Sequence, residues 1–280
     1  QGCTAGSKGT GRGDLKMTGV ENKFAELKKA GKKGLIIYIT AGIPDADSTV
    51  QLVLEAEKAG ADMVELGIPF SDPMADGPVI QKASYDAIQK GMNLHRVLDI
   101  VREIRKKSQI PLVGMGYINI MLNYGFAKLA QDAKEAGLDG FIIPDVPHEE
   151  SGELKKACRD NNLHLVEFVT PGTTDQRIGE TCSTADGFIY CVSINGVTGV
   201  RKIDYSPINR VISHVKKQTA TPCAVGFGIG TPEAAVEAAA EADAVIVGSA
   251  VVKNILEGAD QEAMKLIASM RQALDNSYHK

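Results

Sequence analysis

The sequence predicts a (β/α)8 barrel with an N-terminal helix and extra helices after the second and eighth strands. Short apolar runs alternate with helical patterns along the chain, which is typical of parallel βαβ units. There are eight such runs, and eight parallel units close a barrel whose active site lies at the carboxyl ends of its strands. A chain of 280 residues suits one barrel of this kind.

Each predicted strand is an apolar run that ends at turn residues. The runs are Gly34–Thr40, Ala61–Gly67, Leu112–Gly116, Gly140–Ile143, His164–Thr170, Gly187–Cys191, Cys223–Phe227 and Ala244–Val247. An open, doubly wound sheet is the alternative architecture. That fold favours a glycine fingerprint after the first strand, where this chain has Ala41-Gly42-Ile43-Pro44.

Helical spacing of apolar residues, with capping residues at the ends, predicts the intervening helices. They are Asn22–Ala30, Asp45–Ala59, Val79–Lys90, Asn93–Lys107, Phe126–Ala136, Glu149–Asn161, Asp175–Thr181, Pro207–Gln218 and Thr231–Glu241, with more helix after Ser249.

The composition excludes several classes of protein. A hydrophobic content of 44% with 24% charged residues is typical of a globular chain. The net charge of −4 argues against a nucleic-acid or anionic-membrane surface. No apolar run is long enough to span a membrane. Five scattered cysteines without a C-x-x-C pair indicate reduced thiols in a cytoplasmic protein and no metal site.

The first sixteen residues are rich in glycine and lack the apolar core of a secretory signal. We interpret residues 1–16 as a disordered leader or a segment added by cloning, with a basic transit-peptide remnant as the alternative. Met17 is then the native start, and residues 17–280 are expected to form a single barrel domain.

The stretch Ala61–Pro78 carries the strongest functional signal. Glu65 interrupts an apolar strand, and burying a carboxylate is costly unless it is paired or has a raised pKa. The carboxyl end of a barrel strand is where catalytic groups lie. Asp76 follows in the next loop, so the two carboxylates could divide proton transfer, one with a raised pKa and one ionised. The structural alternatives are a partnered core Glu and, for Asp72 and Asp76, turn formation.

Two glycine-marked loops predict an anion site. The seventh strand runs into Gly226–Gly230 before the helix start Thr231-Pro232, and the eighth runs into Gly248-Ser249 before another helix. Barrels often bind phosphate between these two loops, at backbone N–H groups of helix N-termini. Glycines that only cap strands are the alternative.

A flat apolar ligand is suggested by aromatic residues at three strand ends, Tyr38, Tyr190 and Phe227, although each alone could be core packing. The loop Ser193–Asp204 contains two glycines and could close over the barrel mouth as a lid. A flexible connector is the other interpretation of this loop.

Five motifs together resemble the α subunit of tryptophan synthase: VELGIPFSDPMADGP, DVPHEE, NGVTG, GFGIGTPE and GSAVVK. The likeness extends in order from Glu21 to the C-terminus. It implies a lyase of tryptophan biosynthesis that cleaves indole-3-glycerol phosphate to indole and glyceraldehyde 3-phosphate without a metal or a cofactor of its own. It also implies a partner, the pyridoxal-phosphate-containing β subunit, in an α2β2 assembly.

The resemblance also implies roles for individual residues. Glu65 corresponds to the general acid/base and Asp76 to the second catalytic carboxylate. The other correspondences are Tyr190 and Thr198 as supporting and lid residues, Gly199, Gly228, Gly248 and Ser249 at the phosphate, Tyr38, Ile80, Met115, Ile142 and Phe227 around the indole, and Asp72 and Pro73 in the partner-facing loop. Two positions depart from the family pattern: Tyr38 stands where Phe is common, and Ile194 stands where some members carry Arg.

Two other functions compete with this one. A phosphate-binding isomerase acting on sugar phosphates or aminated ribulose phosphates would use the same glycine loops, but it gives no reason for the Asp72–Asp76 loop beside Glu65. A non-catalytic subunit that binds the phosphate ligand and regulates a partner is the third possibility, and the two intact carboxylates argue against it.

Overall fold

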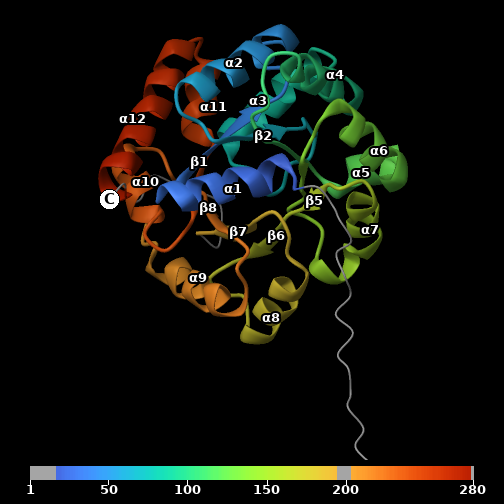
Figure 1. Ribbon diagram of the computed structural model, residues 1–280. Helices are drawn as coiled ribbons and strands as arrows, with labels where there is room; N and C mark the ends of the chain where they lie inside the picture. Colours follow the sequence, from blue (N-terminus) through green and yellow to red (C-terminus); the bar gives the residue numbers. More distant parts are fainter. Residues whose placement is uncertain (1–16, 194–202, 279–280) are drawn as a thin grey trace, which may run out of the picture.

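The computed structural model describes residues 17–193 and 203–278, and within these ranges all strands are parallel members of one sheet. The strands are β1 (Gly34–Thr40), β2 (Met63–Gly67), β3 (Leu112–Met115), β4 (Gly140–Ile142), β5 (His164–Leu165), β6 (Glu167–Val169), β7 (Ile189–Val192), β8 (Cys223–Gly226) and β9 (Ala244–Val247). They surround a common axis inside a ring of helices (Figure 1). The predicted (β/α)8 barrel is confirmed.

The predicted fifth strand, His164–Thr170, forms two short strands instead of one. β5 pairs with β4, β6 pairs with β7, and Val166 lies between them. The Val166 N–H donates to the Phe141 carbonyl at 2.9 Å, and that is where the ladder to β4 stops. Because β5 and β6 are consecutive pieces of the same segment, the chain itself connects β4 to β7 here, and the strand ladder is interrupted beyond Val166.

The helices follow the predicted order. They are α1 (Gly19–Ala30), α2 (Ala46–Lys58), α3 (Pro78–Gln89), α4 (Leu94–Arg105), α5 (Ile118–Tyr124), α6 (Phe126–Ala136), α7 (Gly152–Asp160), α8 (Asp175–Thr184), α9 (Ser206–Gln218), α10 (Pro232–Ala238), α11 (Ser249–Leu256) and α12 (Asp260–Tyr278). The extra helices after the second and eighth strands are α4 and α12. α5 was not predicted, and a separate 3-10 turn, His148–Glu150, precedes α7.

The N-terminal helix α1 lies across the amino ends of the strands (Figure 1). Thr18 caps it in a reciprocal capping box with Glu21, which satisfies free N–H groups at the helix start. The helix buries Val20, Phe24 and Leu27. The ring of Phe24 lies 5.9 Å from that of Phe188, so α1 closes the bottom of the barrel.

Aspartates at the same end of the barrel tie neighbouring strands together. An aspartate directly precedes each of three strands: Asp62 precedes β2, Asp139 precedes β4 and Asp243 precedes β9. Their carboxylates accept backbone hydrogen bonds at 2.8–2.9 Å from the N–H groups of Leu35, Leu112 and Cys223. The first two also pair with Arg271 and Arg105, and these four side chains line a cavity of about 860 Å³. This end is built for stability, which leaves the opposite end for chemistry.

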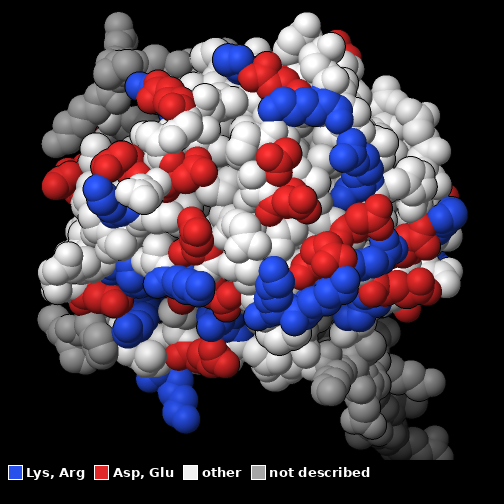
Figure 2. Space-filling model, turned by 90° about the horizontal axis from the view of Figure 1, so that it is seen from above, with Lys and Arg blue, Asp and Glu red and all other residues white. Residues whose placement is uncertain are grey.

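The surface is mixed in charge. Basic and acidic side chains are interspersed over the face shown in Figure 2. Among the described residues, no helix combines the length and the apolarity needed to cross a bilayer.

Candidate active site

Glu65 lies in β2, between Tyr38 of β1 and Val113 of β3 in the strand register. Only 3% of its surface is exposed. One of its oxygens, Oε2, is buried without a hydrogen-bond partner among the described residues. Burial, with a further contribution from the negative charge of Asp76, raises the pKa of Glu65 to about 8. At neutral pH this side chain therefore carries a proton that it can donate.

Asp76 lies in the loop between β2 and α3, and it is also buried, with 6% of its surface exposed. Burial raises its pKa to about 6, while a hydrogen bond from Tyr117 opposes this shift. Asp76 is thus mostly ionised at pH 7 while Glu65 is neutral. The expected division into one raised and one ionised carboxyl holds at that pH, although the pKa of Asp76 is raised as well.

Tyr117 is a site residue that the sequence analysis missed. Its hydroxyl donates to Asp76 Oδ2 at 2.9 Å and accepts the Ala75 N–H at 3.1 Å. Its ring stacks on Phe70 with centroids 5.2 Å apart. Tyr117 therefore fastens the loop that carries Asp76. Its position, one residue beyond Gly116 at the end of a barrel strand, was the available signal.

Two buried tyrosines lie close to the carboxylates. Burial raises the pKa of Tyr38 well above its usual value, and the charges of Asp76 and Glu65 add to this. Burial also raises the pKa of Tyr190, and the charges of Glu65 and Asp76 add to this shift. Each phenol occupies space that a glycine leaves open: a Cβ at Gly67 would lie 2.1 Å from the Tyr38 hydroxyl, and one at Gly226 would lie 2.2 Å from the Tyr190 hydroxyl.

Three of the other apolar residues predicted around a flat ligand also lie at strand ends, whereas Ile80 lies in the first turn of α3. Met115 and Ile142 are register partners at the ends of β3 and β4. The Phe227 ring meets Tyr190 edge-on at 6.3 Å. Phe168 of β6, which the sequence analysis did not select, stacks on Tyr190 at 5.3 Å. Tyr190 therefore lies between two phenylalanine rings.

The two glycine loops lie side by side. Gly248 precedes α11 as its N-cap residue and supplies no side-chain cap. The N–H groups of Ser249 and Ala250 therefore remain available to a ligand, whereas that of Val251 donates to the Gly248 carbonyl at 2.9 Å. A Cβ at Gly230 would lie 3.9 Å from Ala250 Cβ, which places the loop after β8 against the start of α11. Gly228 has φ +74°, a conformation that glycine adopts without strain.

A substitution at Gly248 tests the predicted anion site. A Cβ there would make ordinary contacts with Tyr38 and Ile80, at 3.4 and 3.6 Å, so the backbone tolerates a side chain. We expect Gly248→Val to raise KM for a phosphorylated substrate by tenfold or more while kcat changes less, because the added methyl groups occupy the space of the anion. Initial rates across substrate concentrations check this. An unchanged KM with a normal melting temperature would move the anion elsewhere.

Thr198, Gly199 and Ile194 lie outside the described residues, as does the rest of segment 194–202 of the predicted lid. The residue before this gap, Ser193, donates its hydroxyl to the carbonyls of Gly226 and Phe227, at 2.9 Å each.

In the loop predicted to face the partner, Asp72 and Pro73 both take part in backbone turns. The Asp72 carbonyl accepts a hydrogen bond from the Met74 N–H at 2.9 Å, and the Pro73 carbonyl accepts one from the Asp76 N–H at 3.0 Å. The turn-forming interpretation therefore applies to this loop as well. Within the described ranges, no three His, Cys, Asp or Glu side chains are grouped as a metal site.

A parallel barrel with two buried carboxyl groups of different pKa at its mouth, beside two glycine loops that precede helices, defines a class: barrel enzymes that perform acid–base chemistry. The comparisons specify the family. The sequence model of the tryptophan synthase alpha chain family matches residues 24–278. The chain belongs to this family.

Relatives and solved structures agree with that assignment. The chain is 42% identical to the tryptophan synthase alpha chain of Caldanaerobacter subterraneus subsp. tengcongensis over 263 residues, which cover 92% of this chain and all of the relative. It is 43% identical to that of Citrifermentans bemidjiense, with 92% and 97% of the two chains covered. The crystal structure of tryptophan synthase subunit alpha from Legionella pneumophila superposes with a TM-score of 0.86 at 38% identity, covering 93% of this chain and all of the other.

Proposed function

We propose that this chain is the lyase that cleaves indole-3-glycerol phosphate to indole and glyceraldehyde 3-phosphate, as the α subunit of a tryptophan synthase in the cytoplasm. The observation that carries the proposal is the buried pair of Glu65 and Asp76. One carboxyl is neutral and the other is ionised at pH 7, beside an anion site made of backbone N–H groups.

The reaction is a retro-aldol cleavage, and its proton transfers match this pair. Glu65 first donates its proton to C3 of the indole ring, which makes the ring a leaving group. The resulting carboxylate then takes the proton of the side-chain hydroxyl next to the breaking bond, and the electron pair of that bond returns to the indole ring. Indole and an aldehyde are released, and Glu65 regains its proton.

Asp76 supports the same step by charge. Protonation at C3 puts positive charge on the ring nitrogen, and an ionised Asp76 near the ring N–H stabilises that charge. Tyr117 keeps Asp76 in place through its hydrogen bond of 2.9 Å. The protonated indole itself accepts the electrons, so the proposed chemistry involves no cofactor held by this chain, and pyridoxal phosphate belongs to the partner β subunit.

Measuring indole release from indole-3-glycerol phosphate by the purified chain, alone and with a β subunit, tests the proposal. Release by the chain alone supports the lyase. Interconversion of a sugar phosphate or an aminated ribulose phosphate without indole release would instead support a barrel isomerase. Ligand binding that changes only the partner's activity would support a regulatory subunit.

An exposed apolar surface beside the site supports the docking of a β subunit. Met74, in the loop with Asp76, is 91% exposed, and Leu122 of α5 is 59% exposed. Tyr117 connects the two elements, since it precedes α5 and binds the loop at Ala75 and Asp76. A partner that covered both side chains would remove exposed apolar surface from water. A partner seated here would touch the segment that carries a catalytic carboxylate.

We therefore expect a weakly active free chain that its β subunit activates. Partner binding that favours the arrangement competent for catalysis raises turnover, and ligand binding must strengthen partner binding by the same factor. Pro73→Gly and Met74→Asp should reduce this activation more than the basal rate. Met17→Asp is the matched control, because Met17 is 52% exposed but precedes α1 at the opposite end of the barrel. A rate that stays flat while the β subunit is titrated to saturation contradicts this prediction.

A further inference from the structure

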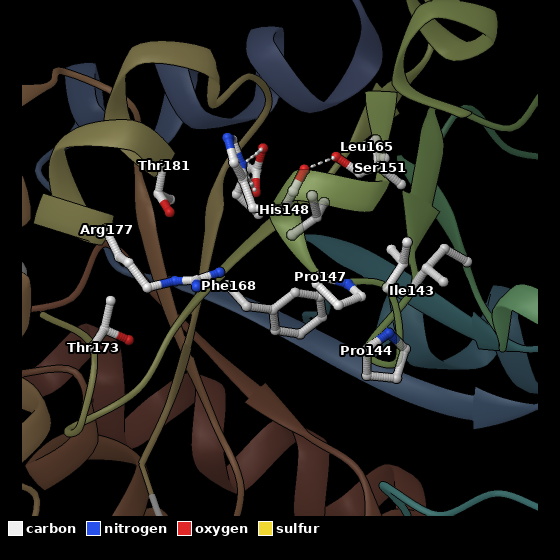
Figure 3. Close-up of a pocket in the computed structure, with 13 residues that line it drawn as sticks. Ile143, Pro144, Pro147, His148, Ser151, Leu165, Phe168, Thr173, Arg177 and Thr181 are labelled. Carbon is white, nitrogen blue, oxygen red and sulfur yellow. Dashed lines mark hydrogen bonds and ion pairs between the residues drawn. The ribbon is translucent and has the colours of Figure 1, made fainter. Parts of the chain in front are cut away.

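A second cavity lies where the wall of the barrel is interrupted. Its volume is about 210 Å³, and its lining includes Glu167 of β6. Ile143 and Pro144 beyond β4 lie on one side and Phe168 of β6 on the other (Figure 3). The β4 ladder ends at Val166, so no strand pairing among the described residues joins β4 to β6 above that point. The cavity occupies this opening.

The lining is amphipathic. Seven apolar residues form one part of it: Ile143, Pro144, Val146, Pro147, Leu165, Val166 and Phe168. Six polar residues form the other: His148, Ser151, Glu167, Thr173, Arg177 and Thr181. Sites for drug-sized ligands are usually about 300–1,000 Å³. The smaller volume here suits a molecule with a single ring.

The buried negative charge in the lining is already neutralised. Glu167 is 7% exposed and forms an ion pair with Lys155, which is 6% exposed. His148 Nδ1 lies 3.1 Å from both carboxylate oxygens, and the Thr184 hydroxyl donates to one of them at 3.1 Å. Glu167 therefore does not require a cationic ligand, and it repels an anionic ligand only weakly.

The cation that a ligand can reach is Arg177. Figure 3 shows its guanidinium extending from α8 toward Phe168, and both residues line the cavity. Its partner is Glu149, at 2.7 and 2.8 Å. Their side chains are 48% and 55% exposed, and an ion pair exposed to water contributes little to stability. A ligand carboxylate can therefore replace Glu149 at small cost.

We propose that this cavity is a binding site for a small aromatic monocarboxylate. The ligand's carboxylate binds the planar fork of Arg177 in a bidentate manner, beside the Thr173 hydroxyl. Its ring fills the apolar part against Phe168, Pro147 and Val166. Because Phe168 stacks on Tyr190 at 5.3 Å, the bound ring is one aromatic side chain away from the catalytic mouth.

Benzoate is a suitable probe, with benzyl alcohol as its uncharged analogue, and ligand-observed NMR on the full chain measures both. We expect a benzoate Kd of the order of 1 mM, the range usual for a ligand this small. Benzyl alcohol should bind at least tenfold more weakly, because it cannot form the charge-assisted pair. Equal binding of the two compounds, or no benzoate binding at 20-fold that concentration (~20 mM), would overturn the proposal.

Variants locate the site. Arg177→Gln should weaken benzoate binding by tenfold or more, and Val146→Trp should abolish it by filling the cavity. Arg102→Gln is the matched control, since Arg102 is 44% exposed in an ion pair with Asp99 on α4, away from the cavity. Thermal melting verifies that each variant is folded. Unchanged affinity in a folded Arg177→Gln chain would place the ligand elsewhere. The readout is binding alone, so the outcome is independent of the proposed lyase activity.

Discussion

Replacing Glu65 with Gln is expected to lower kcat for indole release by about 10²–10⁴, the usual loss when a general acid–base is removed. Gln keeps the shape of the side chain, but it cannot release and regain a proton. Substrate affinity should change little, because the neutral amide resembles the neutral carboxyl that occupies this place at pH 7. Steady-state kinetics with a direct Kd for a product analogue separates the two effects.

The control for this variant is Glu26→Gln, a substitution at a helix surface where the carboxylate is 68% exposed. It should leave kcat and KM unchanged. Turnover of Glu65→Gln within a few-fold of wild type would remove Glu65 from the mechanism, whatever happens to the control.

The pH dependence of the wild type follows from the same two groups. The active form needs Asp76 ionised and Glu65 protonated, so kcat/KM should rise through pH 6 and fall through pH 8. The falling limb should disappear from the residual activity of Glu65→Gln, while the rising limb remains.

The stability of the wild type should also depend on pH, through Glu65. The pKa of Glu65 is raised from 4.5 to about 8 in the folded state, so the folded chain retains a proton that the unfolded chain loses in this range. The free energy of unfolding of the wild type therefore falls as pH increases from about 4.5 to 8, by roughly 1.4 kcal/mol per pH unit from this group. Glu65→Gln lacks this loss, so urea unfolding should show it to be more stable than wild type at pH 8.

Most of the barrel could be predicted from the sequence because the buried strands are largely apolar runs, most of them bounded by glycine or proline. The exceptions have local causes. His164–Thr170 has the composition of one strand, but its two halves pair with different neighbours, which only the tertiary arrangement determines. The helix α5 is short, and its Ile and Asn residues have weak helix propensity. A hydrogen bond from the Ile118 N–H to Asp145 at 2.9 Å and packing against α6 favour it instead.

The site was predictable where function conflicts with burial. Glu65 was conspicuous because a carboxylate in an apolar strand is costly, and the glycines stood out because they precede helices. Tyr117 and Phe168 gave no such signal, since aromatic residues at strand ends are ordinary core residues. Their roles depend on contacts with Asp76 and Tyr190, which lie 41 and 22 positions away along the chain. The two carboxyl groups could be paired from the sequence, but the raised pKa of Asp76 depends on a burial that only the folded loop produces.

Asp76→Asn should reduce kcat by about 10²–10³, because the amide cannot offer the negative charge that stabilises the protonated indole ring in the transition state. Tyr117→Phe is a milder variant for comparison with Asp76→Asn, because it leaves the Asp76 carboxylate in place. It removes the donor that holds the pKa of Asp76 down, so the rising limb of the pH–rate profile should move to higher pH while the carboxylate remains.

The two variants therefore differ in how they respond to pH. Raising the pH from 6 to 7.5 should recover much of the rate lost in Tyr117→Phe, because Asp76 can still ionise, and it should recover none of the rate lost in Asp76→Asn. If the rate of Asp76→Asn increased with pH as that of the wild type does, the rising limb would belong to another group. Asp76 would then act by shape and hydrogen bonding, and charge stabilisation at the ring nitrogen would have to come from elsewhere in the site.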